Sequence, residues 1–479
     1  MLAMAIMAVP VVWNLSRLDA KAIAWTNDTS SYVTFQPFRQ PGYGIFFHSL
    51  HALGLEEPAL AVLQGLVFAL ALGFTAYELS RTRIPLGLAI MLALIWWFPL
   101  NTGLMSLATS FVSEALFLPL LLVACGLALR ARRTRDGRNL VGAVAILATC
   151  IFVREAAIGL LPAMGLVLLL GLALGERNLR KSSAMALAAG VVLTGLIPVL
   201  LGRGAWSVQP PLDRKDSMFL SRVVMLPASL EIQEPNRSLW NRLNRSFIAN
   251  GTNLTCSGRS LFEGQLQEAV RYYIGPKILL DEAPPPAPGS AGALDAGRAK
   301  PSGFVLFQSA AGQAPRDYLV SSGCHLWASL TAGTHMGTKS RLAVFHALQS
   351  VDPETWQLAK FRTDYPLLHF DVPLKKHTEL AYLGFRLLAS AGTMAGVAGC
   401  MGLLLAAAGR RNPLDVAGGA WLLVAGMLFA HSLTVALSVF PDTRFVMVNF
   451  VFQWTLLVFG ADWGTARLHA DMPSLAQTP

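Results

Sequence analysis

The chain has 479 residues, of which 54% are hydrophobic and only 14% charged, and its mean hydropathy is +0.49. Because soluble domains carry about 25% charged residues, this composition excludes an ordinary soluble globular protein and indicates a polytopic membrane protein. The formal net charge of +10 would suggest nucleic-acid binding in a soluble chain. Here many Lys and Arg residues fall in short connections between apolar runs, where they set membrane orientation. We therefore expect membrane lipids, and no nucleic acid, as partners.

Long apolar runs predict an all-α membrane fold. A helix needs about 17 to 25 apolar residues to cross the hydrocarbon core, and about ten runs approach this length. They lie near 1–15, 58–78, 84–100, 108–130, 138–153, 157–174, 183–202, 380–408, 415–439 and 445–463. The first run lacks the basic start and the cleavage site of a signal peptide. We expect it to be a membrane helix whose true start lies upstream.

Basic connections predict the orientation of these helices. Four basic clusters fall on every second connection, and by the positive-inside rule they face the cytoplasm. They are Arg81 to Arg83, Arg130 to Arg135, Arg177 to Lys181, and Arg410 with Arg411. Both termini, including a tail at 464–479, are then cytoplasmic, and a first loop at 16–57 faces outward. The Ala, Leu and Arg-rich composition is typical of bacteria, which predicts the inner (plasma) membrane.

The order of runs predicts three parts. A membrane module of about seven helices covers 1–202 and one of about three covers 380–463, each run being near the length of a membrane helix. Between them lies an outward domain at 203–379, which we expect to be mixed and mainly helical. Its helical patterns lie near 239–248, 261–274 and 340–349. A Pro, Gly and Ala-rich run at 283–301 predicts a flexible linker.

Five cysteines divide by location. Cys125, Cys150 and Cys400 lie in apolar runs, where a cysteine usually acts as a small hydrophobic residue. Cys256 and Cys324 are the two cysteines of the expected outward domain, and an oxidising compartment permits a disulfide between them. The sequence alone does not bring their Cα atoms within bridging distance. Both the paired and the free state therefore stay open.

Charged residues beside membrane segments are costly, so their positions are informative. The predicted topology puts five such places on the outer side: Asp28 with Arg39, Glu114, Arg154 with Glu155, Arg386, and Asp442 with Arg444. Each has an ordinary explanation when taken alone. A loop Asp can cap a helix, a Glu can complement a helix dipole, and an Arg can extend to lipid headgroups. Together they can form one site.

The set suits transfer from a lipid-phosphate donor. A carboxylate at the membrane surface can take a proton from an acceptor hydroxyl. Arginines can hold a phosphate or diphosphate and stabilise the charge on it as a leaving group. Pro41 and Gly42 then start a helix lying in the interface, with Tyr43 at headgroup depth.

These motifs resemble a known family. Asp28, Tyr32 and the run Arg39 to Tyr43 resemble the first outer loop of GT-C-type membrane glycosyltransferases, close to bacterial relatives of dolichyl-phosphate-mannose:protein mannosyltransferases. The run from Ser113 to Phe117 is similar to their acidic motif at the fourth helix. Phe152 to Arg154 and Asp442 to Phe445 resemble two later arginine motifs. The likeness covers the first seven helices and is weaker afterwards.

The resemblance implies roles for individual residues. Asp28 would be the catalytic base, and Arg154 and Arg444 would hold the phosphate of an undecaprenyl-type or dolichyl-type donor, with inversion at the anomeric carbon. Arg39 would position the first loop or the donor, and Glu114 would be a supporting acid. Further supporting residues are Glu155, Tyr32, Tyr43, Asp442 and Arg386.

The first loop differs from the family pattern at two positions. Asn27 occupies a position where many relatives have a second acid, which weakens a metal site there, and Gly44 replaces a Pro. No cofactor follows from the sequence, and a divalent metal stays open.

We therefore expect a glycosyltransferase that uses a polyprenyl-phosphate sugar and a lipid, glycan or protein acceptor. One alternative is a lipid-linked-sugar flippase or another transporter, which should have ionisable residues at mid-helix. The apolar runs here have almost no charge at mid-depth, which disfavours transport. Another alternative is a non-catalytic envelope-assembly protein whose outward domain binds a partner.

Overall fold

The computed structural model describes most of the chain. It covers residues 29, 32–33, 40–85, 88–89, 111–200, 214–270, 275, 278, 303–333, 338–351, 376–409, 413–438 and 443–471. Within these ranges the side chains of 155–156, 195–200, 214–217, 267–269, 338–341, 345, 376–382, 438, 443–447 and 467–471 are not described. The predicted helix at 1–15 and most of the one at 84–100 lie outside the described residues.

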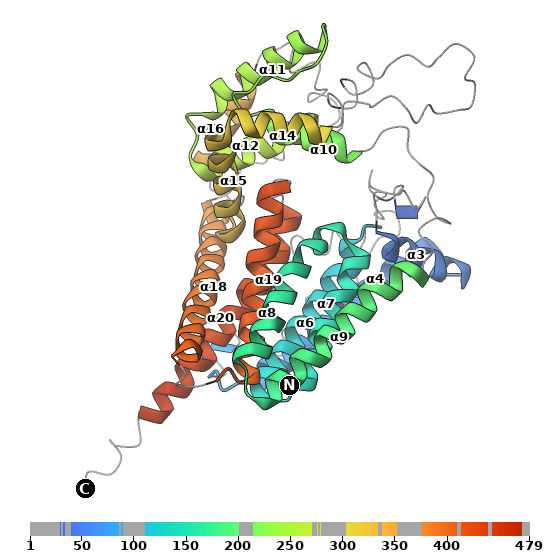
Figure 1. Cartoon of the computed structure of the whole chain (residues 1–479), viewed down its shortest axis with the longest axis vertical. Coiled ribbons are helices and arrows are strands. Elements are labelled where there is room, and N and C mark those ends of the chain that lie inside the picture. Colours follow the sequence, from blue (N-terminus) through green and yellow to red (C-terminus); the bar gives the residue numbers. More distant parts are fainter. Residues whose placement is uncertain are drawn as a thin grey trace. The chain divides into compact units, whose positions relative to one another are not determined.

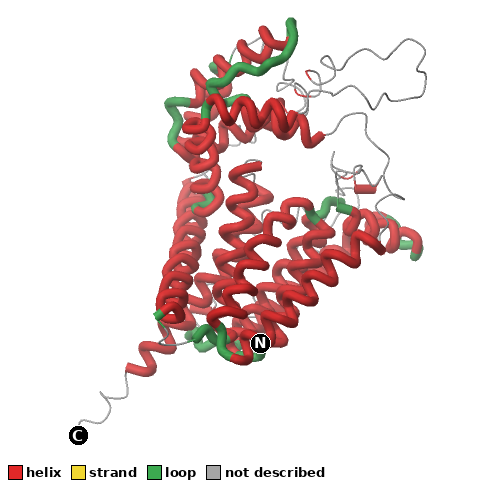
Figure 2. Tube along the Cα trace, in the orientation of Figure 1, coloured by secondary structure: helices red, strands yellow, loops and turns green. Residues whose placement is uncertain are grey.

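Helices dominate the structure (Figure 2). Across the described ranges there is no strand, and one isolated bridge joins Gly175 to Leu414. The expectation of an all-α chain is confirmed at this level, whereas the expected outward domain is helical rather than mixed where it is described. The chain divides into two compact units. The first contains 1–209, 387–432 and 447–479, and the second contains 210–386 with 433–446.

The first unit is built from long apolar helices (Figure 1). In chain order they are α3 (Pro41–Ala52), α4 (Glu57–Ser80), α6 (Glu114–Thr134), α7 (Gly137–Val153), the short 3-10 helix η2 (Glu155–Gly159), α8 (Leu160–Leu174) and α9 (Arg177–Leu200). Most of α18 (Lys376–Ala408), α19 (Val416–Ser438) and α20 (Thr443–Asp471) belongs to the same unit. Helix α6 packs between α4 and α7, and α9 packs on α7 and α8.

Five described helical segments are long and apolar enough to cross a membrane: 57–80, 114–134, 157–174, 383–408 and 416–437. Helix α7 is apolar but shorter, because it ends at Val153. These segments identify a membrane protein, while a total of about ten crossings stays a prediction. The run expected at 108–130 differs from the structure, since α6 begins only at Glu114 after a turn at residues 112–113.

The basic cluster in the last turn of α6 also has a packing role. Arg133 lies 2.7 Å from the Glu78 carboxylate of α4, and Arg132 lies 3.3 Å from Asp462 of α20. The Arg132 guanidinium also stacks on Trp421, 5.1 Å from the ring centroid. Arginines that the sequence marks as orientation signals therefore also connect the ends of the helices.

The second unit packs shorter helices around an apolar core. They are α10 (Arg214–Val223), α11 (Asn236–Gly251), α12 (Cys256–Ala269), α14 (Gly303–Gln313), α15 (Pro315–Leu330) and α16 (Thr338–Gln349). Trp240, Phe247, Phe262 and Leu266 are among the fully buried residues of this core. The periodicities near 239–248 and 340–349 coincide with α11 and α16.

A disulfide joins Cys256 of α12 to Cys324 of α15, with their Cα atoms 4.9 Å apart. It closes a loop with a sequence separation of 68 residues. In the chain-entropy account, a loop of this length stabilises the fold by on the order of 4 kcal/mol. Of the remaining cysteines, Cys125 and Cys150 are buried and Cys400 is half-buried.

Candidate functional site

Glu114 and Arg154 form an ion pair at the centre of the site. Arg154 Nη1 lies 2.6 Å from Glu114 Oε1, and the two side chains are only 8% and 4% exposed. Arg154 follows the last residue of α7 with an extended backbone, which directs the chain into η2. Its guanidinium also lies 5.6 Å from the centroid of the Phe117 ring, one turn into α6. The start of α6 and the end of α7 therefore hold opposite charges together away from water.

Tyr32 of the first loop is joined to this pair through Ser113. The Tyr32 hydroxyl lies 2.7 Å from Ser113 Oγ, and Ser113 Oγ donates to Glu114 Oε2 over 3.2 Å. A serine hydroxyl has one proton, so Tyr32 must be the donor in its own bond to Ser113. Hydrogen bonds thus run in one direction, from Tyr32 through Ser113 to the Glu114 carboxylate.

Tyr43 of α3 completes this side of the site. Its ring meets Tyr32 edge to face with centroids 5.4 Å apart, and Gln64 Nε2 of α4 donates to its hydroxyl over 2.9 Å. Burial raises the pKa of the Tyr43 phenol above its usual value, the Gln64 bond lowers it, and the neighbouring Tyr32 and Glu114 raise it. Tyr43 therefore stays protonated and acts through hydrogen bonds rather than as a base.

Gly42 explains how the first loop is docked on the arginine segment. A Cβ atom at Gly42 would lie 2.5 Å from the carbonyl oxygen of Phe152, in the last turn of α7. Only glycine permits this approach, because a real side chain would clash with backbone that cannot move aside. Pro41 precedes it as the first residue of α3, where its fixed φ favours helix initiation. The Pro-Gly turn thus packs directly beside the residues that lead into Arg154.

Both oxygens of the Glu114 carboxylate are engaged, one by Arg154 and one by Ser113. This carboxylate therefore holds and neutralises Arg154 rather than being presented to a substrate. Removing one partner of a buried pair leaves an uncompensated charge, at a cost of about 3–5 kcal/mol.

Three buried polar residues of α19 and α20 in the first unit did not emerge from the sequence. His431 Nδ1 of α19 lies 2.8 Å from Asn449 Oδ1 of α20, and both residues are fully buried. The positive charge of Arg154 interacts electrostatically with His431. One turn beyond Asn449, Gln453 Nε2 donates to Thr393 Oγ1 over 3.1 Å. These residues are visible as polar positions inside apolar runs, but they carry no fixed charge, and the predicted site rested on the charged residues at the ends of the runs.

The other predicted site residues divide into two groups. Asp28, Arg39 and Asp442 lie outside the described residues. Glu155 opens η2 and Arg444 lies in the first turn of α20, but their side chains are not among those described. Arg386 is half-buried in α18 and, like Arg444, belongs to the second unit. The network therefore brings together Tyr32, Tyr43, Glu114 and Arg154 of the predicted set.

Within the described part of the chain, no group of three or more His, Cys, Asp or Glu side chains is placed to hold a metal ion. Comparison of the chain with protein-family models, with curated proteins and with solved structures finds no match in any of the three.

Proposed function

We propose that this chain is a GT-C-type glycosyltransferase that moves a sugar from a polyprenyl-phosphate carrier to an acceptor on the outer face of a membrane. One observation supports the proposal most. Three motifs far apart in the sequence meet in one buried network: the loop tyrosines Tyr32 and Tyr43, the acid Glu114 and the arginine Arg154. This is the grouping that a site built from the first outer loop and the neighbouring helix ends requires.

The chemistry is a single displacement with inversion. An acceptor oxygen attacks the anomeric carbon, the bond from that carbon to the phosphate oxygen breaks, and the phosphate leaves with the electron pair. Asp28 takes the proton of the acceptor hydroxyl. Arg154, with Arg444 and Arg39, stabilises the leaving phosphate through charge-assisted hydrogen bonds. Glu114 holds Arg154 in place, while Tyr32 and Tyr43 orient the first loop.

The same proposal covers the finer topology. About ten membrane helices, each near the length needed to cross the hydrocarbon core, lie in a bacterial inner membrane with both termini cytoplasmic. Glu155, Arg386 and Asp442 support the site from neighbouring connections. The donor is a polyprenyl-phosphate sugar, and the acceptor is a lipid, a glycan or a protein. A divalent metal is not required by the roles assigned here.

The test is sugar release from radiolabelled polyprenyl-phosphate donors by membranes that contain the full chain. A positioned base contributes about 10²–10⁴-fold to rate, so Asp28→Asn should lose at least about 100-fold at equal expression. Glu231→Gln, which changes an exposed carboxylate of the second unit, is the matched control and should release sugar at the wild-type rate. Equal release by the wild type and Asp28→Asn would remove Asp28 from the mechanism.

One observation favours a second function, a transporter of a lipid-linked sugar. His431 lies inside an apolar span and bonds to Asn449, and buried ionisable residues in such spans often mark transport pathways. Proteoliposomes loaded with labelled lipid-linked sugar separate the two functions. Movement of the intact lipid between leaflets without sugar release would favour the transporter. If neither sugar release nor lipid movement occurs with any donor, the result would favour a non-catalytic envelope-assembly protein.

A further inference from the structure

Helix α15 has its polar and apolar faces reversed. Its buried residues are small or polar: Ser321, Ser322, Cys324, His325, Ala328 and Ser329. On the opposite side lie Leu319, Val320 and Trp327, which are 67%, 47% and 56% exposed. At 3.6 residues per turn these three fall within a sector of about 100° on one side of the helix. The exposed Arg316, in the first turn of α15, lies in the same sector. The side chains that would normally be buried in a core are thus the ones facing out.

Helix α11 of the same unit shows the ordinary arrangement. It buries Trp240, Leu243 and Phe247 in the core, while Arg237 and Arg245 are exposed. A surface helix in water is expected to have this pattern. The medium around the outer face of α15 must therefore differ from the water around α11.

The buried face of α15 explains why polar residues are tolerated inside. Ser321 and His325 both bond to the Glu263 carboxylate, at 2.5 Å and 2.8 Å. Ser322 Oγ accepts a hydrogen bond from Arg222 Nη2 over 3.0 Å. The polar face is therefore occupied by partners, and the apolar face is left for something else to cover.

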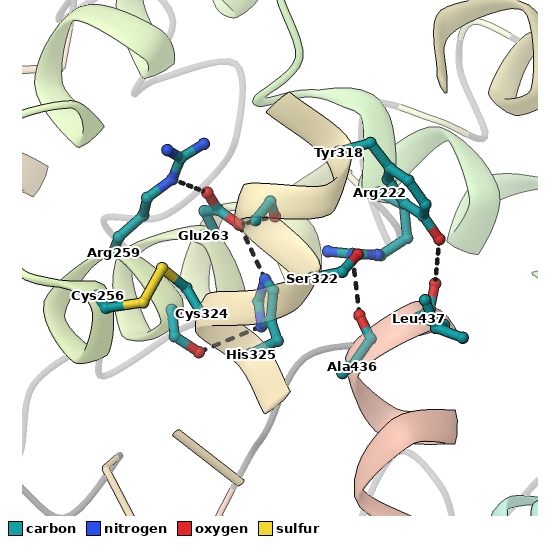
Figure 3. Close-up of polar contacts among 12 residues, drawn as sticks. Arg222, Cys256, Arg259, Glu263, Tyr318, Ser322, Cys324, His325, Ala436 and Leu437 are labelled. Atoms are coloured by element: carbon teal, nitrogen blue, oxygen red, sulfur yellow. Dashed lines mark hydrogen bonds and ion pairs between the residues drawn. A yellow bond between two sulfur atoms is a disulfide. The ribbon is translucent and has the colours of Figure 1, made fainter. Parts of the chain in front are cut away.

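The position of α15 indicates what covers it. The Tyr318 hydroxyl donates to the carbonyl oxygen of Leu437 over 3.2 Å, and Arg222 Nη2 donates to that of Ala436 over 2.9 Å (Figure 3). Leu437 is the last residue of the apolar span Val416–Leu437. These bonds satisfy carbonyl groups that the end of a helix leaves without partners. Helix α15 is thus attached where a membrane-crossing helix leaves the hydrocarbon core.

We propose that the apolar face formed by Leu319, Val320 and Trp327 is embedded in the lipid bilayer beside the end of α19. The 16 residues of α15 extend about 24 Å, which is too short to cross a core of about 30 Å. The helix therefore lies in the interface, with its leucine and valine toward the acyl chains. Tryptophan is enriched at this depth, since its ring is apolar and its N–H is polar.

Lipid fits this face better than a protein partner does, because the face continues from the end of a lipid-crossing helix. Lipid contact at this face requires only that α19 crosses the membrane, so it is expected whether or not the chain is a glycosyltransferase.

Nitroxide labels on the full chain in phospholipid nanodiscs test the proposal. Single labels are placed by Leu319→Cys and Trp327→Cys in a Cys400→Ala background, because Cys400 is the partly accessible free cysteine. Ala249→Cys, on the exposed side of α11, is the matched control. Collision rates are measured with oxygen, which concentrates in lipid, and with a water-soluble nickel complex.

At positions 319 and 327 oxygen should relax the label more than nickel does, and the order should reverse at position 249. Nickel-dominated relaxation at all three positions would overturn the proposal, because the face would then lie in water. Low collision rates with both reagents at 319 and 327 would also overturn it, in favour of a protein cover. As a label-free check, brominated lipids should quench tryptophan fluorescence less in Trp327→Phe than in the wild type.

Discussion

The two units each contain a buried carboxylate network, and the two are built in opposite ways. In the second unit Glu263 accepts hydrogen bonds from Arg259 and Ser321, both at 2.5 Å, and pairs with His325 at 2.8 Å (Figure 3). All these residues come from α12 and α15, the same two helices that the disulfide joins. In the first unit Glu114 pairs with Arg154 at the end of α7 and is linked through Ser113 to Tyr32 of the first loop.

This difference separates a structural network from a candidate site. Residues one turn apart on one helix, such as Arg259 and Glu263 on α12, are neighbours as soon as the helix forms, and Ser321 and His325 of α15 reach Glu263 when the two helices pack. Such contacts hold α12 and α15 together within the second unit. Connections positioned by rigid helices, in contrast, are where binding and catalytic residues concentrate. The Glu114 network is of this second kind.

The protonation states of the second network follow from its geometry. Burial by itself raises the pKa of Glu263, but the bond to His325, the charges of His325 and Arg259 and the bond from Ser321 together lower it to about 2. Burial lowers the pKa of His325. The His325 ring lies between two partners, with Nε2 2.8 Å from Glu263 Oε2 and Nδ1 3.2 Å from Ser260 Oγ. Both ring nitrogens are therefore used within the second unit.

The largest expected effect comes from breaking the Glu114–Arg154 pair. Glu114→Gln should destabilise the first unit by about 3–5 kcal/mol, since it leaves Arg154 buried without its counter-charge. It should also abolish sugar transfer. The double variant Glu114→Gln/Arg154→Gln removes both charges and should regain much of the stability, as followed by thermal unfolding in detergent, without regaining transfer. A double variant that is both stable and active would make this network structural, like the one around Glu263.

Removing the disulfide probes the second network alone. Cys256→Ser should lower the free energy of unfolding of the second unit by on the order of 4 kcal/mol. Limited proteolysis should then cut the second unit first, while the helices of the first unit stay protected. Simultaneous cleavage of both units would mean that they unfold together and that the disulfide does not stabilise the second unit alone. Cys125→Ser, at a buried free cysteine of the first unit, shows the effect of losing a thiol where there is no disulfide.

Acid should weaken the second unit through Glu263. Its folded pKa of about 2 lies below the unfolded value of about 4.3, so its stabilisation is complete above about pH 4.3 and is lost as the pH falls toward 2. Unfolding of the wild type followed over this range should show stability rising with pH. Glu263→Gln should be less stable at neutral pH and should lack most of this slope. An unchanged slope in the variant would assign the acid sensitivity to other carboxylates.

The smallest effect is expected at the close contact between α3 and α7. Gly42→Ala should cost about 1–3 kcal/mol, as overpacking usually does, and should reduce transfer by displacing the first loop from Arg154. Gly402→Ala is the matched control, because no atom lies within 4 Å of a Cβ there. It should be neutral or slightly stabilising, since alanine favours the helix. Equal transfer by Gly42→Ala and the wild type would show that this docking is not needed.

Much of the helical framework could be predicted from the sequence. Apolar runs located α4, α19 and the main part of α18 to within a few residues, and periodicity located α11 and α16. The sequence motifs also predicted Tyr32, Tyr43, Glu114 and Arg154 as site residues, but they did not predict which of these residues are in contact. It missed His431, Asn449 and Gln64, because a polar residue inside an apolar run has no periodic signal of its own.

The sequence by itself therefore determined that this protein resides in a lipid membrane, and it determined many of the segments that become helices. Both depend on composition and on spacing along the chain, which are local properties. Only the tertiary structure decided which polar groups meet, because contacts such as Arg154 with Glu114 depend on how each helix is rotated against its neighbours. The same reason applies to α15, whose reversed faces become visible only when Glu263 and Arg222 are seen packed against its polar side.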